Sequence, residues 1–454
     1  MPLDELYFAV ADVVERVKTK KKSLRSAVYE HQFQDKKKLL RLSCETVKYA
    51  QLFDGLLENS NLSTRLLDER AYEGSLPLIH VLLYEFLIGN GLNQATQRLK
   101  RPIHSLNMEI RQQEKALSAQ GRGLEQLRNG FEEEKEKEIE IPRYARINGL
   151  KWTRDEAIET LREEKWQIID GSDTIPFSQQ ITQLRDDQVL FDPHIPELLI
   201  FANSANLHAY WMIEQRYLIF QDKASCLPAF LISPPSGSHC VDTCAAPGNK
   251  TSHLAAYVGN EGCVWAFDRD PTRANTMKRL VKQSGAGDIV SVECGDFLRI
   301  DPSEERWKTV EFAVVDPPCS GSGMVKRMDE WTGSSAQADR LGKLANLQAM
   351  LLKHALKLPS LKRLAYSTCS IHEEENEQVV REVLKECSTD WRLAENLLPM
   401  WALRGKESYE FGKHCLRADP KITFTNGFFV VVFERIEEKK KKKKAKKRKI
   451  DDEC

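Results

Sequence analysis

The sequence predicts an α/β protein whose main domain, residues 231–436, is a doubly wound and mostly parallel sheet. Short apolar runs rich in β-branched residues alternate there with segments of helical pattern, and several runs end in an acidic residue or are followed by a cysteine. Such runs form strands that are buried on both faces. Open α/β sheets bind ligands outside the carboxyl ends of their strands, so the polar residues at these ends are the first candidates for a functional site.

The first strand leads into a tight turn at residues 242–251, with the sequence Asp-Thr-Cys-Ala-Ala-Pro-Gly-Asn-Lys-Thr. A turn of this kind brings backbone N–H groups and a helix N-terminus close to a ligand, which suits the carboxylate or phosphate of a cofactor. The glycine spacing fits neither a phosphate loop nor a dinucleotide fingerprint. The turn is therefore a candidate cofactor site outside those two classes.

Acidic residues close four successive strands. An acid at the end of the second strand, residues 263–268, is where doubly wound folds bind the ribose hydroxyls of a nucleoside. Acids also cap the turns that follow strands without any ligand. Here four acids and two cysteines lie at strand ends of the same predicted sheet, and this combination favours a binding site. The four acids are Asp242, Asp268, Asp296 and Asp316.

Two cysteines follow predicted strands. Cys319 lies in Asp-Pro-Pro-Cys after residues 312–315, and Cys369 lies in Ser-Thr-Cys-Ser after residues 364–366. Two thiols at the strand ends of one cleft suggest covalent chemistry followed by a separate release step. The alternative for either is an inert buried cysteine. We assign that state to the other nine, which are Cys44, Cys226, Cys240, Cys244, Cys263, Cys294, Cys387, Cys415 and Cys454.

Three blocks, residues 242–251, 316–324 and 366–371, resemble the Sun-domain RNA cytosine-C5 methyltransferases. They look most like the family's fifth branch, which acts on large-subunit ribosomal RNA, and the similarity runs from about Ile141 to Arg435. The wider family usually has a second glycine where this chain has Asn249. Asparagine also tolerates a left-handed backbone, so the turn is retained.

The resemblance implies a Rossmann-like class I methyltransferase domain with a seven-stranded sheet and S-adenosyl-L-methionine as cofactor; we expect no metal. It also implies an order of the cysteines that the residues alone leave open: Cys369 is the nucleophile and Cys319 the release residue, while Asp316 supports the cytosine ring. DNA cytosine methyltransferases use the Pro-Cys thiol as nucleophile instead. The residues expected to bind the cofactor are Cys244, Ala245, Ala246, Pro247, Gly248, Asn249, Lys250, Asp268, Arg273, Asp296 and Asp316.

Two thiols suit methylation of cytosine. Carbon 5 of its aromatic ring is too weak a nucleophile, whereas a thiolate added at carbon 6 makes carbon 5 enamine-like, and a base must later remove the carbon 5 proton. Two other functions remain open. An amino-group methyltransferase would stack an aromatic side chain where this chain has Cys319, and a ribosome-assembly factor without catalysis would not need both cysteines.

Five segments are expected. They are a helical domain (1–106), a charged linker or loose helix (107–140), a small α/β domain (141–230), the methyltransferase domain (231–436) and a disordered basic tail (437–454). In the family the small domain helps to grip RNA. Its first strand carries Arg143, Tyr144 and Arg146, which suit stacking and phosphate contacts. Thr153 and Glu156 form a capping-box pattern before a helix.

Formal charge is balanced at zero, but residues 439–449 hold ten basic residues. Without them and without the terminal acids Asp451, Asp452 and Glu453, the remaining body is near −7. The tail is either a solubilising end or, as we favour, a nuclear or nucleolar address that also attracts RNA phosphates. We therefore expect ribosomal RNA or pre-ribosomal particles as partners of a monomer. Eleven scattered cysteines without a CxxC pair argue against disulfide scaffolds and zinc sites. The sequence has no apolar run of about eighteen residues, which a membrane-spanning helix would need. Its N-terminus also lacks the pattern of a transit peptide. We therefore expect an intracellular enzyme.

Overall fold

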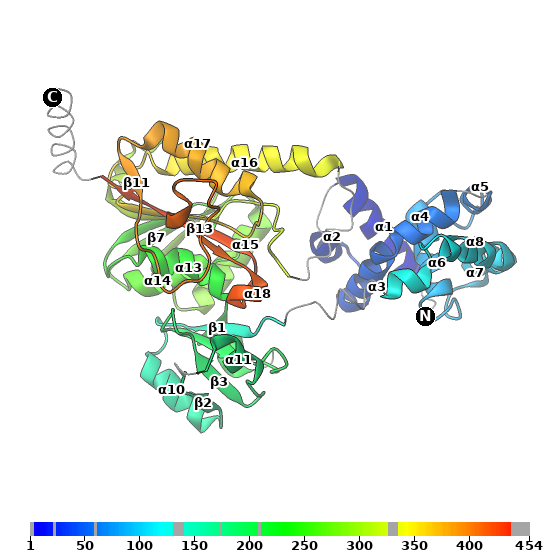
Figure 1. Ribbon diagram of the computed structural model, residues 1–454, viewed down its shortest axis with the longest axis horizontal. Helices are drawn as coiled ribbons and strands as arrows, with labels where there is room; N and C mark the ends of the chain where they lie inside the picture. Colours follow the sequence, from blue (N-terminus) through cyan, green and yellow to red (C-terminus); the bar gives the residue numbers. More distant parts are fainter. Residues whose placement is uncertain are drawn as a thin grey trace. The chain divides into compact units, whose positions relative to one another are not determined.

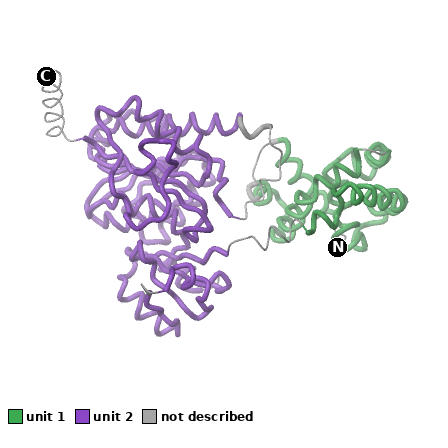
Figure 2. The backbone as a smooth tube through the Cα atoms, viewed as in Figure 1, with its two compact units in different colours: residues 1–138, 326–334 green, residues 139–325, 335–454 purple. Residues whose placement is uncertain are grey.

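The computed structural model describes residues 4–20, 24–58, 61–129, 140–171, 175–207, 210–325 and 335–436. The chain divides into two compact units (Figure 2). One unit holds helices α1 to α8, and the other holds all the named strands together with the later helices. The basic tail that we expected at residues 437–454 lies outside the described residues.

The first unit consists of α-helices around an apolar core of its own (Figure 1). Helix α3 shows why these segments are helical: Leu39, Leu42 and Val47 recur at helical spacing and are buried, and Asp35 caps the first turn. The helices of this unit are α1 (Asp4–Lys20), α2 (Leu24–Glu30), α3 (Lys36–Lys48), α4 (Ala50–Glu58), α5 (Leu62–Leu67), α6 (Leu76–Leu87), α7 (Gln97–Ser105) and α8 (Asn107–Ala119).

Helix α8 differs from our expectation of a linker or loose helix from residue 107. Its Ile110 and Leu117 are buried in the core of the helical unit, and the helix packs against α4. The high charge of this segment misled the prediction, because the charged residues lie on the other side of an amphipathic helix. The helical unit therefore extends at least to the end of α8.

The second unit contains a small five-stranded sheet with the order β2-β3-β4-β1-β5 (Figure 1). Only β2 and β3 run parallel to each other. The predicted capping box is confirmed, since Thr153 and Glu156 bond reciprocally at the start of α10. The elements are β1 (Arg143–Ile147), α10 (Arg154–Glu163), β2 (Gln167–Ile169), α11 (Phe177–Thr182), β3 (Gln188–Phe191), β4 (Leu198–Phe201), α12 (Trp211–Glu214) and β5 (Leu218–Phe220).

The larger sheet has the order β11-β13-β10-β9-β6-β7-β8. Strands β10, β9, β6, β7 and β8 are parallel, and β13 is antiparallel to β10. This confirms the predicted fold class, with β12 as an additional strand on β13. The strands are β6 (His239–Asp242), β7 (Cys263–Asp268), β8 (Val290–Cys294), β9 (Val310–Val315), β10 (Arg363–Thr368), β11 (Trp391–Leu393), β12 (Leu416–Ala418) and β13 (Phe428–Arg435).

Helices cover both faces of this sheet, because its strands are apolar on both sides. Helices α13, α14 and α15 pack on one face, and α16 and α17 on the other (Figure 1). Helix α13 packs on β10 and β13, so it belongs to the methyltransferase domain, although we expected the boundary at residue 230. The helices are α13 (Lys223–Ile232), α14 (Asn249–Val258), α15 (Pro271–Gln283), α16 (Ser335–Ala355), α17 (Glu377–Cys387) and α18 (Pro420–Thr423).

Candidate active site

The predicted site residues meet at one edge of the large sheet. Asp242 and Asp268 are the last residues of β6 and β7, while Asp316 follows β9 and Cys369 follows β10. These four strands are parallel neighbours, so their carboxyl ends meet at the same edge. Asp296 lies just beyond β8, where its carboxylate accepts a hydrogen bond from the N–H of Leu298.

The two cysteines lie in direct contact, with their Sγ atoms 3.1 Å apart. The hydrogen bond with Cys369, together with burial and nearby negative charge, raises the pKa of Cys319 well above its ordinary value. Cys319 is therefore a protonated thiol in the free protein. Both cysteines are only partly buried, whereas Cys226, one of the cysteines we assigned to the core, is fully buried.

Asp316 is held beside the thiols by two contacts. Its Oδ2 lies 2.8 Å from Nζ of Lys250, and its Oδ1 accepts a hydrogen bond of 2.6 Å from the Ser367 hydroxyl. Burial alone would lower the pKa of Lys250, but the charge of Asp316 outweighs it and raises this pKa. Lys250 also donates to the hydroxyl of Ser225, 3.0 Å away. The site therefore contains a carboxylate of fixed orientation with a permanently charged ammonium behind it.

The turn after β6 leaves its backbone open to a ligand. Gly248 precedes α14 with φ +104°, and no side chain caps the first turn of that helix. A Cβ on Gly248 would lie 3.1 Å from Met277 of α15, so glycine is favoured by space as well as by backbone conformation. The N–H groups at the N-terminus of α14 are thus available to an anionic or polar group.

Asp242 lies beneath this turn and is buried. Its Oδ2 accepts a hydrogen bond of 2.8 Å from Thr251, while its Oδ1 has no partner among the described residues. Burial raises the pKa of Asp242 to about 7. The unpaired buried oxygen is a place where a bound polar group would gain a contact, because such atoms are costly to leave unpaired.

Asp268 and the turn are linked by Arg273 of α15. Its Nη1 lies 3.4 Å from Oδ2 of Asp268, and its Nη2 donates to the carbonyl oxygen of Ala246 at 2.6 Å. The Asp268 Oδ1 accepts a further hydrogen bond, 3.0 Å long, from the N–H of Asp270. A carboxylate has about four acceptor positions, so Asp268 can still accept hydroxyl groups from a ligand.

Two glycines that the sequence analysis missed bring the cysteine segments together. Gly323 donates its N–H to the carbonyl oxygen of Cys369 at 3.0 Å, and Gly427 donates to Gly323 at 2.7 Å. A Cβ on Gly323 would lie 2.1 Å from the Gly427 carbonyl oxygen, so no larger residue fits. The Gly-Ser-Gly stretch after Cys319 was a signal of close backbone approach that we did not use.

The predicted contact of Tyr144 and Arg146 with RNA is wrong. Both are buried: the Tyr144 hydroxyl donates to Phe424 at 2.8 Å, and Arg146 donates to Gln221 and Ser252 at 3.0 and 3.1 Å. They occupy alternate positions of β1, so they share the face that packs on the methyltransferase domain. Arg143 is half-buried and donates to Asn203; its contact with RNA stays a prediction.

Comparisons with known proteins agree with this architecture. Residues 229–434 match the family described as 16S rRNA methyltransferase RsmB/F. Residues 141–221 and 37–120 match the ferredoxin-like and N-terminal domains of NOL1/NOP2/Sun domain family member 5. A curated relative from Caenorhabditis elegans, the 26S rRNA (cytosine-C(5))-methyltransferase nsun-5, is 52% identical over 96% of this chain and 99% of its own. The chain belongs to the NOL1/NOP2/Sun domain family.

Other members of the NOL1/NOP2/Sun domain family align over most of the chain. The 28S rRNA (cytosine-C(5))-methyltransferase of Mus musculus is 39% identical over 95% of this chain and 91% of its own. The 25S rRNA (cytosine-C(5))-methyltransferase rcm1 of Schizosaccharomyces pombe is 32% identical over 94% and 90%. A solved methyltransferase homologue from Pyrococcus horikoshii aligns with TM-score 0.51 and 24% identity over 65% of this chain and 87% of its own, which supports the fold.

Among the described residues, no helix is long and apolar enough to cross a membrane. Within the same residues, no cluster of histidine, cysteine and acidic side chains could hold a metal ion.

Proposed function

We propose that this protein methylates carbon 5 of a cytosine in large-subunit ribosomal RNA, using S-adenosyl-L-methionine and a covalent bond between a cysteine and carbon 6. One observation carries the proposal: the Cys319 and Cys369 sulfurs lie 3.1 Å apart at the sheet edge that also bears Asp316. One thiol would suffice for a nucleophile alone, so a second supports a separate release step. The names of the three relatives support ribosomal RNA as the substrate.

In the first step, the thiolate of Cys369 adds to carbon 6 of the cytosine, and the Sγ–carbon bond moves electron density to carbon 5. The carboxylate of Asp316 accepts a hydrogen bond from the amino group of the ring. Lys250 and Ser367 fix its orientation before the substrate binds, so this support costs little reorganisation. S-adenosyl-L-methionine, when bound, supplies an electrophilic methyl group.

Release requires a base for the proton that carbon 5 still carries. Cys319 takes this proton, the electrons of the C–H bond re-form the double bond between carbons 5 and 6, and the Cys369 thiolate leaves. The raised pKa of Cys319 has the Cys369 hydrogen bond as its largest cause. Once the Cys369 sulfur is bonded to carbon 6, that cause weakens. Cys319 must first give up its own proton to solvent water, and the resulting thiolate is the base that takes the carbon 5 proton.

The chain's own residues fit the cofactor. The uncapped N-terminus of α14 can receive its carboxylate, Asp268 its ribose hydroxyls, and Asp296 lies at the next strand end, where the adenine would sit. Arg273 holds Asp268 and the turn in one arrangement. The full set proposed for cofactor binding is Cys244, Ala245, Ala246, Pro247, Gly248, Asn249, Lys250, Asp268, Arg273, Asp296 and Asp316.

An RNA substrate of this site should be flexible or unpaired. Carbon 6 is covered by neighbouring bases in a stacked helix, so the target must be flipped out, which costs a few kcal/mol in a duplex. The proposal places the protein in the nucleolus as a monomer that acts on ribosomal RNA or pre-ribosomal particles. The amino-group methyltransferase is less well supported, because Cys319 contacts a second thiol where that chemistry needs an aromatic ring.

A denaturing gel with RNA tests the roles of the cysteines. Cys369→Ala should abolish both methylation and trapping by RNA that contains 5-azacytosine, because it removes the atom that bonds to carbon 6. Cys319→Ala should form the adduct with unmodified RNA and fail to resolve it. A covalent band from Cys369→Ala but not from Cys319→Ala would reverse the assignment. Absence of any adduct and methylation in the wild type would favour the assembly factor.

Bisulfite sequencing identifies the substrate. In cells that lack the protein, one cytosine of large-subunit ribosomal RNA should lose its methyl group, and the wild-type chain should restore it while Cys369→Ala does not. An unchanged methylation pattern in the large-subunit RNA would contradict the proposed substrate.

A further inference from the structure

Three consecutive residues, Glu375, Asn376 and Glu377, have no part in the chemistry above although they lie close to it in the chain. They form the turn between the short 3-10 helix η4 (Glu373–Glu375) and α17, and each is 0% exposed. Two carboxylates and an amide are rarely buried so completely unless they are paired, because desolvation is costly. Their hydrogen-bond partners therefore indicate what the turn does.

Glu375 holds the segment that carries Cys319. Its carboxylate accepts hydrogen bonds from the N–H and the hydroxyl of Ser320, at 2.8 and 2.5 Å. It also accepts one of 3.0 Å from the amide of Gln348, which donates to the carbonyl oxygen of Pro318 as well. Both chain neighbours of Cys319 are thus held by Glu375: Ser320 by direct hydrogen bonds and Pro318 through Gln348.

Asn376 holds the segment that carries Cys369. Its Oδ1 accepts a hydrogen bond from the Thr368 hydroxyl, and its Nδ2 donates to the carbonyl oxygen of Ser370 at 2.8 Å. Thr368 and Ser370 are the two chain neighbours of Cys369. One amide side chain therefore holds both chain neighbours of Cys369, Thr368 by its hydroxyl and Ser370 by its backbone carbonyl.

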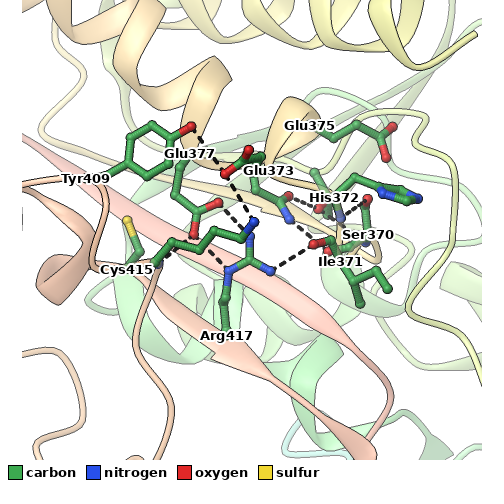
Figure 3. Close-up of polar contacts among 12 residues, drawn as sticks. Ser370, Ile371, His372, Glu373, Glu375, Glu377, Tyr409, Cys415 and Arg417 are labelled. Carbon is green, nitrogen blue, oxygen red and sulfur yellow. Dashed lines mark hydrogen bonds and ion pairs between the residues drawn. The ribbon is translucent and has the colours of Figure 1, made fainter. Parts of the chain in front are cut away.

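Glu377 acts through Arg417 on Ile371, which follows Ser370 in the segment after Cys369 (Figure 3). Arg417 of β12 forms a two-point pair with it, at 2.8 and 2.5 Å, and donates its remaining nitrogen to the carbonyl oxygen of Ile371 at 3.0 Å. The N–H of Lys406 also donates to Glu377 at 3.0 Å. A two-point guanidinium–carboxylate pair fixes orientation as well as distance.

We propose that Glu375 and Asn376, supported by Glu377, are positioning residues that set how the Cys319 and Cys369 thiols face each other. This inference rests on the proposed function. The two cysteines lie on different segments, but both segments are fastened to adjacent residues of one turn. Their separation therefore depends on that turn as well as on the direct hydrogen bond from Gly323 to Cys369, and a shift of either side chain would move one thiol relative to the other.

The two residues should affect different steps. Glu375→Gln replaces an acceptor oxygen by a donor that faces the donors of Ser320 and Gln348, so the Cys319 segment should move. Release should slow, and the covalent adduct should accumulate. Asn376→Asp keeps the bond from Thr368 but loses the donor to Ser370, so the Cys369 segment should move. Adduct formation itself should slow, and no adduct should accumulate.

The experiment uses the full chain, with unmodified RNA and S-adenosyl-L-methionine, and measures methyl transfer and adduct in the same reactions. Methyl transfer should fall on the order of a hundredfold in both variants, since a misplacement of about 1 Å has such effects. The fraction of protein in adduct should rise only in Glu375→Gln. Glu374→Gln is the matched control, because this glutamate lies in η4 directly before the turn and is exposed; it should behave as the wild type.

Thermal unfolding separates positioning from stability. If adduct formation and methyl transfer fall together in both variants, in proportion to the folded fraction, the turn is a structural feature only and the inference is overturned. Wild-type behaviour of either variant overturns it as well. Ser320→Ala removes the hydroxyl hydrogen bond to Glu375 and should also accumulate adduct. This variant replaces Glu375→Gln in the experiment if Glu375→Gln does not fold. A wild-type chain without methylation or adduct contradicts the proposed function instead.

Discussion

Asp268 is the single residue on which nucleoside recognition should depend most. It ends β7, and Arg273 and the N–H of Asp270 already orient its carboxylate. If it accepts both ribose hydroxyls, Asp268→Ala removes two charge-assisted hydrogen bonds. We expect S-adenosyl-L-methionine to bind more weakly by about 2 kcal/mol, measured by calorimetry.

The control for this measurement is Glu261→Ala. Glu261 is an exposed acid before the amino end of the same strand, so its removal changes the charge without touching the carboxyl edge. Its affinity for the cofactor should equal that of the wild type. Equal affinity in Asp268→Ala would remove Asp268 from the cofactor site.

Asp242 should make stability depend on pH in the opposite sense to an ordinary surface acid. Burial raises its pKa to about 7, against about 4 in an unfolded chain. At a pH between these two pKa values, Asp242 is protonated in the folded state but not in the unfolded chain. Its contribution to the free energy of unfolding is therefore full below pH about 4 and is lost as the pH rises through about 7. The shift of about three units corresponds to about 4 kcal/mol.

Asp242→Asn removes this dependence. Between pH about 5 and about 8, the free energy of unfolding should fall by less in the variant than in the wild type, as measured by denaturant titration at each pH. The difference between the two proteins isolates Asp242 from the other titrating groups. Parallel pH profiles would show that Asp242 does not titrate in this range.

At the scale of elements, the site depends on the contact between the loop after β9 and Gly427, the residue directly before β13. Gly323→Ala would place a Cβ 2.1 Å from the carbonyl oxygen of Gly427, so the loop that follows Cys319 would have to move. We expect methyl transfer to fall on the order of a hundredfold. Cofactor affinity should change little, because Gly323 is not among the residues proposed to bind the cofactor.

Gly342→Ala in the exposed part of α16 is the control for this change, because no atom lies within 4 Å of the Cβ it adds. It should retain both activity and cofactor affinity. Methyl transfer by Gly323→Ala at the wild-type rate would mean that the close approach of the two glycines does not position the thiols.

At the scale of the whole molecule, a change in the basic tail should alter the affinity for RNA without altering the rate of methylation at saturating RNA. Deletion of residues 439–449 removes ten basic residues and should weaken RNA binding and flatten its salt dependence, because phosphate attraction is independent of sequence. The saturating rate should be kept. Methylation measured against RNA concentration checks this division, and a lower saturating rate with unchanged affinity would contradict it.

The strands of the large sheet, the turn after β6 and the cysteines at the strand ends could be predicted from the sequence. These features depend on residue type and on spacing within a few residues, which is information that a local segment carries. The acids Asp242, Asp268 and Asp316 were found at a common edge for the same reason, since parallel strands bring their ends together whatever the details of packing.

Only the tertiary structure decided what depends on partners distant in the chain. Tyr144 and Arg146 read as exposed RNA contacts until β1 placed them against the methyltransferase domain, and α8 read as a linker until its apolar side met α4. The hydrogen bonds between Glu375 and Ser320, which hold the Cys319 segment, join residues that are 55 positions apart in the chain. No local pattern encodes such a contact. A charged side chain can be buried only when its hydrogen-bond partner lies beside it, and that partner comes from a distant part of the chain.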